Sequence, residues 1–177
     1  MKYMFTFCLL VSTSLVVAQP KFRPTWTNNP NDTIGVTVQL QPGWNIVSSP
    51  VLAESDSVPL LFPICLGCPL WPPPPHYRDP CRLPPGAATW LKCPTGGVIT
   101  IFGERIVRDT IRVLAGWNLI GSISAPIDTS SVVSIPADNR VSNFFGWRGY
   151  YEVSDTIQPG QGYWVKARSA GWLVLSQ

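Results

Sequence analysis

The sequence predicts an all-β protein with two tandem homologous units, each a β-sandwich or a small barrel with short helical turns. Two observations predict this fold. Glycine and proline number 14 and 19 of 177 residues, whereas charged residues are only 13%, which is typical of short strands joined by tight turns. In addition, Gly43-Trp44-Asn45 recurs as Gly116-Trp117-Asn118. A motif that recurs at such a distance along the chain indicates a repeated structural unit.

The first eighteen residues are expected to be a signal peptide. Met1 and Lys2 give a charged start, an apolar stretch covers 3–17, and Ala18 fits a cleavage site before Gln19. The stretch is short for a membrane span and contains several Ser and Thr, so we expect no membrane insertion after cleavage; an uncleaved anchor is the alternative. The mature protein would be secreted, extracellular or on the cell surface, with the periplasm as an alternative. An extended arm over 19–33 precedes the first unit.

The first predicted unit covers residues 34–103. Its elements follow from two-residue alternation and from turn residues. In order, they are an alternating strand from Ile34, a turn at Gly43, a strand from Trp44, a helical turn within Ser55–Phe62 capped by Asp56, two strands flanking Pro85-Gly86, and a last strand Val98–Phe102.

A linker over 104–108 leads to the second predicted unit, residues 109–177. Its elements repeat those of the first unit. They are an alternating strand Thr110–Leu114, a turn at Gly116, a strand from Trp117, a helical turn within Thr129–Ile135 capped by Asp128 or Thr129, two strands flanking Pro159-Gly160, and a last strand Trp172–Leu175.

The cysteines predict disulfides in the first unit. Four remain beyond the signal peptide, all within a Pro/Cys-rich loop over 63–93: Cys65, Cys68, Cys81 and Cys93. An even number in an exported chain favours two disulfides. We expect Cys65 and Cys68 each to join Cys81 or Cys93, with both such pairings open; a zinc site or a redox-active pair is the alternative.

Four consecutive prolines distinguish the two units. Pro72–Pro75 stand where the second unit can form a hairpin around Arg148-Gly149. Proline removes the backbone donor that a strand ladder needs. We therefore expect the disulfides to replace ladder hydrogen bonds lost in the first unit.

The repeated aromatic and amide residues are interpreted as the scaffold of the repeat. Four tryptophans at matching positions are expected in the core, and two asparagines are expected to bond nearby backbone through their amides. The predicted scaffold residues are Trp44, Asn45, Trp90, Trp117, Asn118 and Trp164.

Candidate binding residues come from the aromatic hairpin segment in which the second unit differs from the first. Trp147, Arg148, Tyr150 and Tyr151 are expected at or beside a hairpin tip, where they could stack on a sugar or anchor a protein contact. Loop decoration without a ligand is the alternative. No catalytic residue is predicted: the chain has one histidine, His76, and lacks the common nucleophile, zinc and phosphate-loop motifs. No metal or cofactor is expected, and a net charge of +3 gives no case for nucleic acid.

The second unit resembles a repeat of secreted and surface proteins of bacteria. The resemblance rests on Ala115–Ile120 and Pro159–Lys166; in that repeat a Gly-Trp-Asn-Leu-Ile-Ser strand is followed by a Pro-Gly-x-Gly-Tyr-Trp-Val strand. The first unit departs from it at Ala87-Ala88-Thr89. The resemblance implies a noncatalytic, extracytoplasmic all-β module without a settled ligand.

The expected function is extracellular binding or adhesion, with a protein or a carbohydrate at the cell surface as partner. The alternative is a structural subunit of an extracellular assembly, joined through the N-terminal arm or edge strands. The chain would then self-assemble. A fragment of a longer protein is a further alternative.

Overall fold

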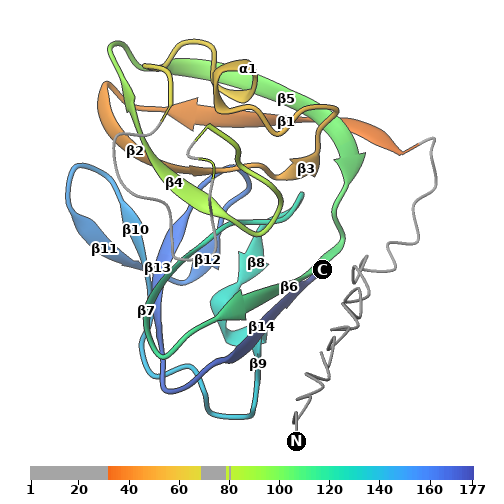
Figure 1. Cartoon of the computed structure of the whole chain (residues 1–177), viewed down its shortest axis with the longest axis vertical. Helices are drawn as coiled ribbons and strands as arrows, with labels where there is room; N and C mark the ends of the chain where they lie inside the picture. The colour runs from red at the N-terminus through yellow and green to blue at the C-terminus, as the bar shows by residue number, and fades with distance from the viewer. Residues whose placement is uncertain (1–31, 69–78, 80) are drawn as a thin grey trace, which may run out of the picture.

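The computed structural model describes residues 32–68, 79 and 81–177 (Figure 1). The predicted signal peptide, most of the N-terminal arm, Pro72–Pro75 and His76 lie outside these residues. The described elements are β1 Thr33–Leu40, β2 Gly43–Ser48, β3 Val51–Leu52, α1 Val58–Leu61, β4 Ala88–Cys93, β5 Gly97–Arg105, β6 Arg108–Val113, β7 Gly116–Ile120, β8 Ile127–Asp128, the 3-10 turn η1 Thr129–Ser131, β9 Val133–Ile135, β10 Phe144–Trp147, β11 Tyr151–Ser154, β12 Thr156–Ile157, β13 Tyr163–Ala167 and β14 Gly171–Ser176. The predicted all-β fold is confirmed.

The first half of the chain, at the top of Figure 1, forms two small antiparallel sheets. One has the strand order β1-β5-β3 and the other pairs β2 with β4. In β1 the alternation places Val38 and Leu40 in the core, whereas Thr37 and Gln39 face solvent. These side chains pack with Phe62, and with others from β2 to β5, into one apolar cluster.

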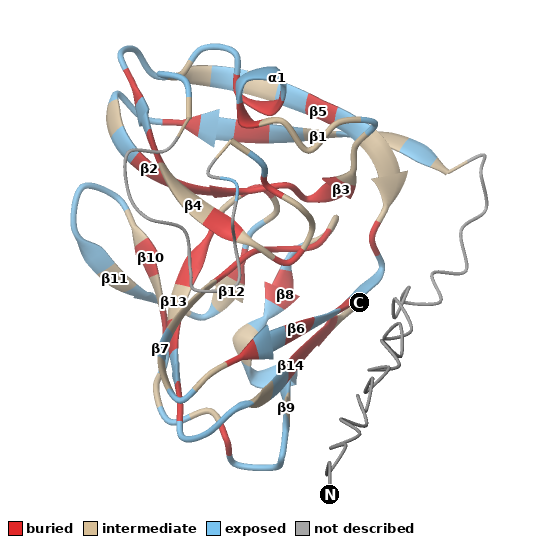
Figure 2. Ribbon diagram, in the orientation of Figure 1, coloured by how far each residue is buried: buried red, intermediate tan, exposed pale blue. Residues whose placement is uncertain are grey.

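The second half forms the sheets β11-β10-β13-β7 and β6-β14-β9 and the pair β12-β8. It has an apolar cluster of its own, which contains Phe144, Tyr163 and Leu173. In contrast to this core, β11 is exposed along much of its length (Figure 2). Among the described strands no sheet closes on itself, so each half is built from open sheets rather than from a barrel.

The two halves are joined by equivalent contacts in both directions. The Ser48 N–H donates to the Gly160 carbonyl at 2.9 Å, and the Gly121 N–H donates to the Gly86 carbonyl at 2.9 Å. Ser48 is the last residue of β2 and Gly121 directly follows β7, whereas Gly86 and Gly160 lie in the Pro-Gly turns. Each half therefore binds the turn of the other, and the buried Ser48 and Ser122 hydroxyls meet between them at 2.8 Å.

Only Ile106 and Val107 separate β5 from β6, so the strands extend into the predicted linker.

The disulfides are Cys65–Cys93 and Cys68–Cys81. The prediction that Cys65 and Cys68 pair with the two later cysteines, rather than with each other, is confirmed. Cys65–Cys93 ties the segment after α1 to the last residue of β4, which is buried. Beside it, the Leu66 N–H donates to the Lys92 carbonyl at 2.8 Å.

One of the two predicted helix caps is wrong. The side chain of Asp128 accepts from the Ser130 N–H and caps η1, as expected. The N-cap of α1 is instead Ser57, without a side-chain bond. Asp56 lies one residue too early to cap the helix, and its carboxylate pairs with Arg82 at 3.1 Å.

Candidate binding surface

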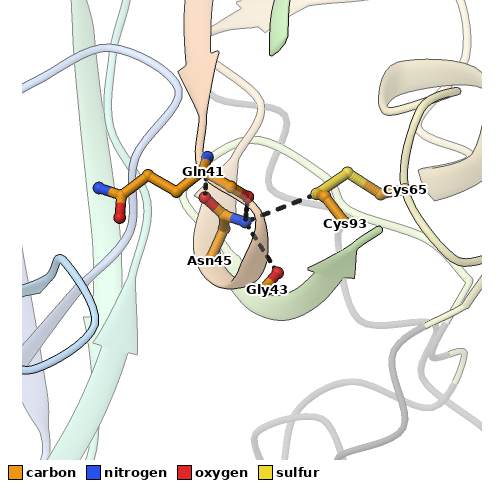
Figure 3. The surroundings of a disulfide bond; sticks show 5 residues. All are labelled: Gln41, Gly43, Asn45, Cys65 and Cys93. Carbon is orange, nitrogen blue, oxygen red and sulfur yellow. Dashed lines mark hydrogen bonds between the residues drawn. A yellow bond between two sulfur atoms is a disulfide. The ribbon is translucent and has the colours of Figure 1, made fainter. Parts of the chain in front are cut away.

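The same asparagine-centred turn begins β2 and β7. Gly43 and Gly116 have φ angles of 91° and 96°, which favour glycine. The Asn45 amide accepts from the Gln41 N–H and donates to the carbonyls of Gln41 and Gly43 (Figure 3). The predicted bonding of this amide to nearby backbone is therefore confirmed, and Figure 3 also shows its 3.5 Å contact with the Cys93 sulfur.

Asn118 makes the equivalent bonds in the second half. Its amide accepts from the Leu114 N–H at 2.8 Å and donates to the carbonyls of Leu114 and Gly116 at 2.9 Å each. Because successive side chains of a strand point to opposite faces, an inward asparagine directs the preceding tryptophan outward.

The prediction that the repeated tryptophans form the core is wrong. Trp44 is 39% exposed and Trp117 is 54% exposed, while Trp90 and Trp164 are half-buried. The strand register explains their orientation, because Trp44 lies opposite Lys92 and Trp117 lies opposite Lys166. Opposed residues project from the same face of a sheet, and a face that carries lysine must remain in contact with water.

The outer face of the sheet β11-β10-β13-β7 is aromatic across its four strands. Trp147 lies opposite Tyr151, and Phe145 lies opposite Trp164. Trp117 completes this face on β7, with its ring centroid 5.7 Å from that of Phe145. Inner-face neighbours such as Phe144 and Tyr163 belong to the core instead.

Tryptophans of the first half extend this aromatic surface. The Trp90 ring lies 5.0 Å from Trp147 and 6.3 Å from both Tyr151 and Trp44, in edge-to-face geometry. Trp147 and Tyr151 are themselves 5.1 Å apart. We call this surface the aromatic face and define it by Trp44, Trp90, Trp117, Phe145, Trp147, Tyr151 and Trp164.

An open depression of about 480 Å³ lies on the aromatic face. It is lined by Trp117, Phe145, Tyr151 and Trp164, one side chain from each strand of the sheet. A volume of this size lies within the range of ligand pockets, which runs from roughly 300 to 1,000 Å³. The surface therefore offers a concave apolar site rather than isolated aromatic side chains.

The structure separates the four residues predicted at the hairpin tip. Trp147 is half-buried on β10, and its indole N–H donates to the Trp44 carbonyl at 2.9 Å, so it connects the two halves. Arg148 pairs with Glu152. Tyr150 is 63% exposed in the turn, and Tyr151 is 54% exposed on the aromatic face.

Two lysines lie beside the exposed tryptophans at equivalent positions. Lys92 and Lys166 are both exposed, and they are the only lysines among the residues that the structure describes. The ion pairs found within that part of the chain join arginines to acids and include neither lysine. The aromatic face thus carries positive charge at two sites without an acidic neighbour bound to either ammonium.

A buried acid lies away from the aromatic face. Asp109 on β6 is buried, and burial raises the pKa of its carboxyl above the ordinary value, although the Thr110 N–H donates to Oδ1 at 2.7 Å. Oδ2 has no hydrogen-bond partner in the described structure.

Within the described ranges, no three His, Cys, Asp or Glu residues are grouped as a metal site would require. No helix in those ranges is long and apolar enough to cross a membrane.

Sequence reasoning missed Phe145 and the outward direction of the four tryptophans. The signal was present in Trp90-Leu91-Lys92 and Trp164-Val165-Lys166, because residues two apart on a strand share a face.

Comparison with protein-family models, with curated proteins and with solved structures gave no match.

Proposed function

We propose that this chain is a secreted, noncatalytic binding protein that contacts an extracellular protein or glycan through the aromatic face. The observation that carries the proposal is the continuity of seven aromatic side chains from both halves, with Trp44, Trp117 and Tyr151 exposed. Large exposed apolar patches of this kind mark interaction sites. The two disulfides fit an oxidising, extracytoplasmic compartment.

The exposed rings are sufficient to provide substantial binding energy. An aromatic side chain can bury about 150–250 Å², so covering the exposed half of Trp117 removes roughly 100 Å² from water. At about 25 cal/mol per Å² this contributes on the order of 2–3 kcal/mol before the cost of association. Tryptophan and tyrosine with contributions of this size are typical binding hot spots.

The aromatic face is also held in place before any ligand arrives. Trp90 packs edge-to-face against Trp44, Trp147 and Tyr151, and the Trp147 indole is fixed by its hydrogen bond to the Trp44 carbonyl. Rings that are already ordered lose little side-chain entropy on binding. The resemblance of the second unit to modules of bacterial surface proteins agrees with the noncatalytic and extracytoplasmic parts of the proposal.

The test is a ligand screen with a matched pair of tryptophan variants. The mature protein is applied to arrays of glycans and of extracellular proteins, and each hit is repeated with Trp117→Ala and Trp172→Ala. Trp172 is 44% exposed but lies on β14, in another sheet, so it controls for nonspecific adhesion of indole. We expect Trp117→Ala to weaken binding at least tenfold and Trp172→Ala to leave it unchanged. Equal effects of the two variants would contradict the proposal.

A structural subunit is the second candidate function. Within the described strands β1 pairs only with β5, so its other edge is available to a strand of another copy. Size-exclusion chromatography of the mature protein over a hundredfold range of concentration tests this alternative. A constant monomer at all concentrations would contradict it.

A further inference from the structure

We propose that the aromatic face binds an anionic polysaccharide strand, whose sugar rings stack on the exposed aromatic side chains while its acidic groups pair with Lys92 and Lys166. This inference rests on the proposed binding function and names the class of ligand. It follows from three features of the face: its charge, its extent across both halves, and the largely apolar, aromatic lining of the depression.

The positive charge of the aromatic face indicates that its ligand is negatively charged. Lys92 projects beside Trp44, and Lys166 projects beside Trp117, both exposed and outside the ion pairs of the described residues. A cationic ligand would be attracted by the aromatic rings but repelled by both ammonium groups. An anionic ligand gains a charge-assisted hydrogen bond from each lysine.

The arrangement of the lysines indicates an extended ligand. One lysine belongs to β4 of the first half and the other to β13 of the second. Aromatic contacts lead from Trp44 through Trp90 to Tyr151, and Tyr151 lines the same depression as Trp117. A polymer that reaches both lysines therefore crosses aromatic side chains along its whole course.

The depression favours a sugar over a peptide. Its lining consists of four aromatic side chains, and the strands beneath use their backbone groups in the ladders β10–β11 and β13–β7. A peptide buried there would leave its own N–H and C=O groups without partners, which is costly. A sugar ring can place its C–H face on an aromatic ring while its hydroxyl groups remain in water. Protein interfaces are also depleted in lysine.

The experiment uses the mature protein and follows its tryptophan fluorescence on titration with polymers. The anionic polysaccharides are polygalacturonate, alginate, hyaluronate and chondroitin sulfate. Fully methyl-esterified polygalacturonate supplies the same sugar rings without charge, and poly-L-glutamate supplies carboxylates without sugar. We expect saturable binding of at least one anionic polysaccharide, and binding at least tenfold weaker for the neutral ester and for polyglutamate.

Lysine variants show whether the charge acts at this surface. Lys92→Gln and Lys166→Gln should each weaken binding about fivefold, and Lys166→Arg should retain most of it because the positive charge remains. Arg112→Gln is the matched control, since Arg112 is exposed and lies opposite Trp172 on another sheet. Thermal unfolding of each variant verifies that the fold is intact.

Each contrary outcome has a distinct meaning. Equal binding of the neutral ester, or no effect of the lysine variants, overturns the anionic ligand. The proposed function stands in that case if Trp117→Ala still weakens binding at least tenfold. Tighter binding of polyglutamate overturns the polysaccharide in favour of an acidic protein. Failure of all four anionic polysaccharides overturns the inference. Ligand binding that persists undiminished in Trp117→Ala contradicts both the inference and the proposed function.

Discussion

Replacing Asp109 by asparagine should stabilise the protein at neutral pH. Asp109 is 7% exposed, and its Oδ2 lacks a hydrogen-bond partner among the described residues. It also lies against the Pro-Gly turn of the first half, because a Cβ added to Gly86 would come within 2.6 Å of Oδ2. Burial where the two halves meet therefore disfavours the ionised form of this carboxyl, a form that becomes more populated as the pH rises.

The pH dependence follows from the direction of the pKa shift. Burial raises the pKa of Asp109 in the folded protein, so the native state holds this proton more tightly than the unfolded chain. The resulting stabilisation is complete below the ordinary aspartate pKa of about 3.9 and is lost as the pH rises through the raised native pKa. Asparagine has nearly the same shape, and its amide carries no charge at any of these pH values.

The expected gain follows from removal of the buried negative charge, because the asparagine amide still places a polar group where Oδ2 has no partner. An unpaired buried acceptor costs roughly 1–3 kcal/mol and more when it is charged, so removing the charge by Asp109→Asn should add about 1–2 kcal/mol at pH 7.5. This corresponds to a rise in Tm of roughly 2–8 °C for a chain of this size.

Urea and thermal unfolding at pH 3.5 and 7.5 provide the measurement. Asp155→Asn is the control, because Asp155 is an exposed acid of the same half. The gain of the Asp109 variant over the wild type should appear at pH 7.5 and shrink at pH 3.5. A lower Tm at pH 7.5, or a gain that is the same at both pH values, would refute the reasoning.

Two further predictions concern the turns and the disulfides. Asn118→Ala removes three hydrogen bonds to Leu114 and Gly116 and should lower the free energy of unfolding in urea by about 1–3 kcal/mol. Asn143→Ala, at an exposed site, is the control and should lower it by less than about 0.5 kcal/mol. Equal losses of stability in the two variants would contradict the role of the turn. Reductant should destabilise the first half more than the second, because the Cys65–Cys93 disulfide closes a 28-residue separation, worth roughly 3–4 kcal/mol. Hydrogen exchange should then accelerate in β2 and β4 before β13 and β14, and uniform acceleration would contradict this prediction.

The sequence determined local features more reliably than the packing of the aromatic side chains. The asparagine turns, the Asp128 cap and the separation of Cys65 from Cys68 all follow from neighbouring residues, and the structure confirms them. Repetition identified the tryptophans as structurally important but not the direction in which they point. That direction depends on the inward asparagines and on the lysines across the ladder.

The composition of the aromatic face was beyond sequence reasoning for a different reason. Trp90 contacts Trp147 across the two halves, and an internal period specifies each unit without specifying how the units pack. Part of this packing consists of backbone bonds between strand ends and Pro-Gly turns, which leave no distinctive side-chain pattern, and part consists of serine hydroxyls such as those of Ser48 and Ser122. A pairing of Trp147 with a tryptophan 57 residues earlier in the chain therefore became visible only in three dimensions.

The two ends of the aromatic face are held by different chemistry at equivalent positions. In the first half the Leu66 N–H bonds the Lys92 carbonyl, next to the Cys65–Cys93 disulfide. In the second half the Val141 N–H bonds the Lys166 carbonyl at 2.9 Å.

Ala167 replaces Cys93 in the second half, and a buried amide takes the place of the disulfide. The Asn139 side chain accepts from the Ser169 N–H and donates to the Ser169 carbonyl. Each of these anchors holds a segment whose N–H fixes the backbone of a lysine on the aromatic face. The two halves therefore present the same Trp–Lys pair at the surface, although the contacts that hold the backbone beneath each lysine differ.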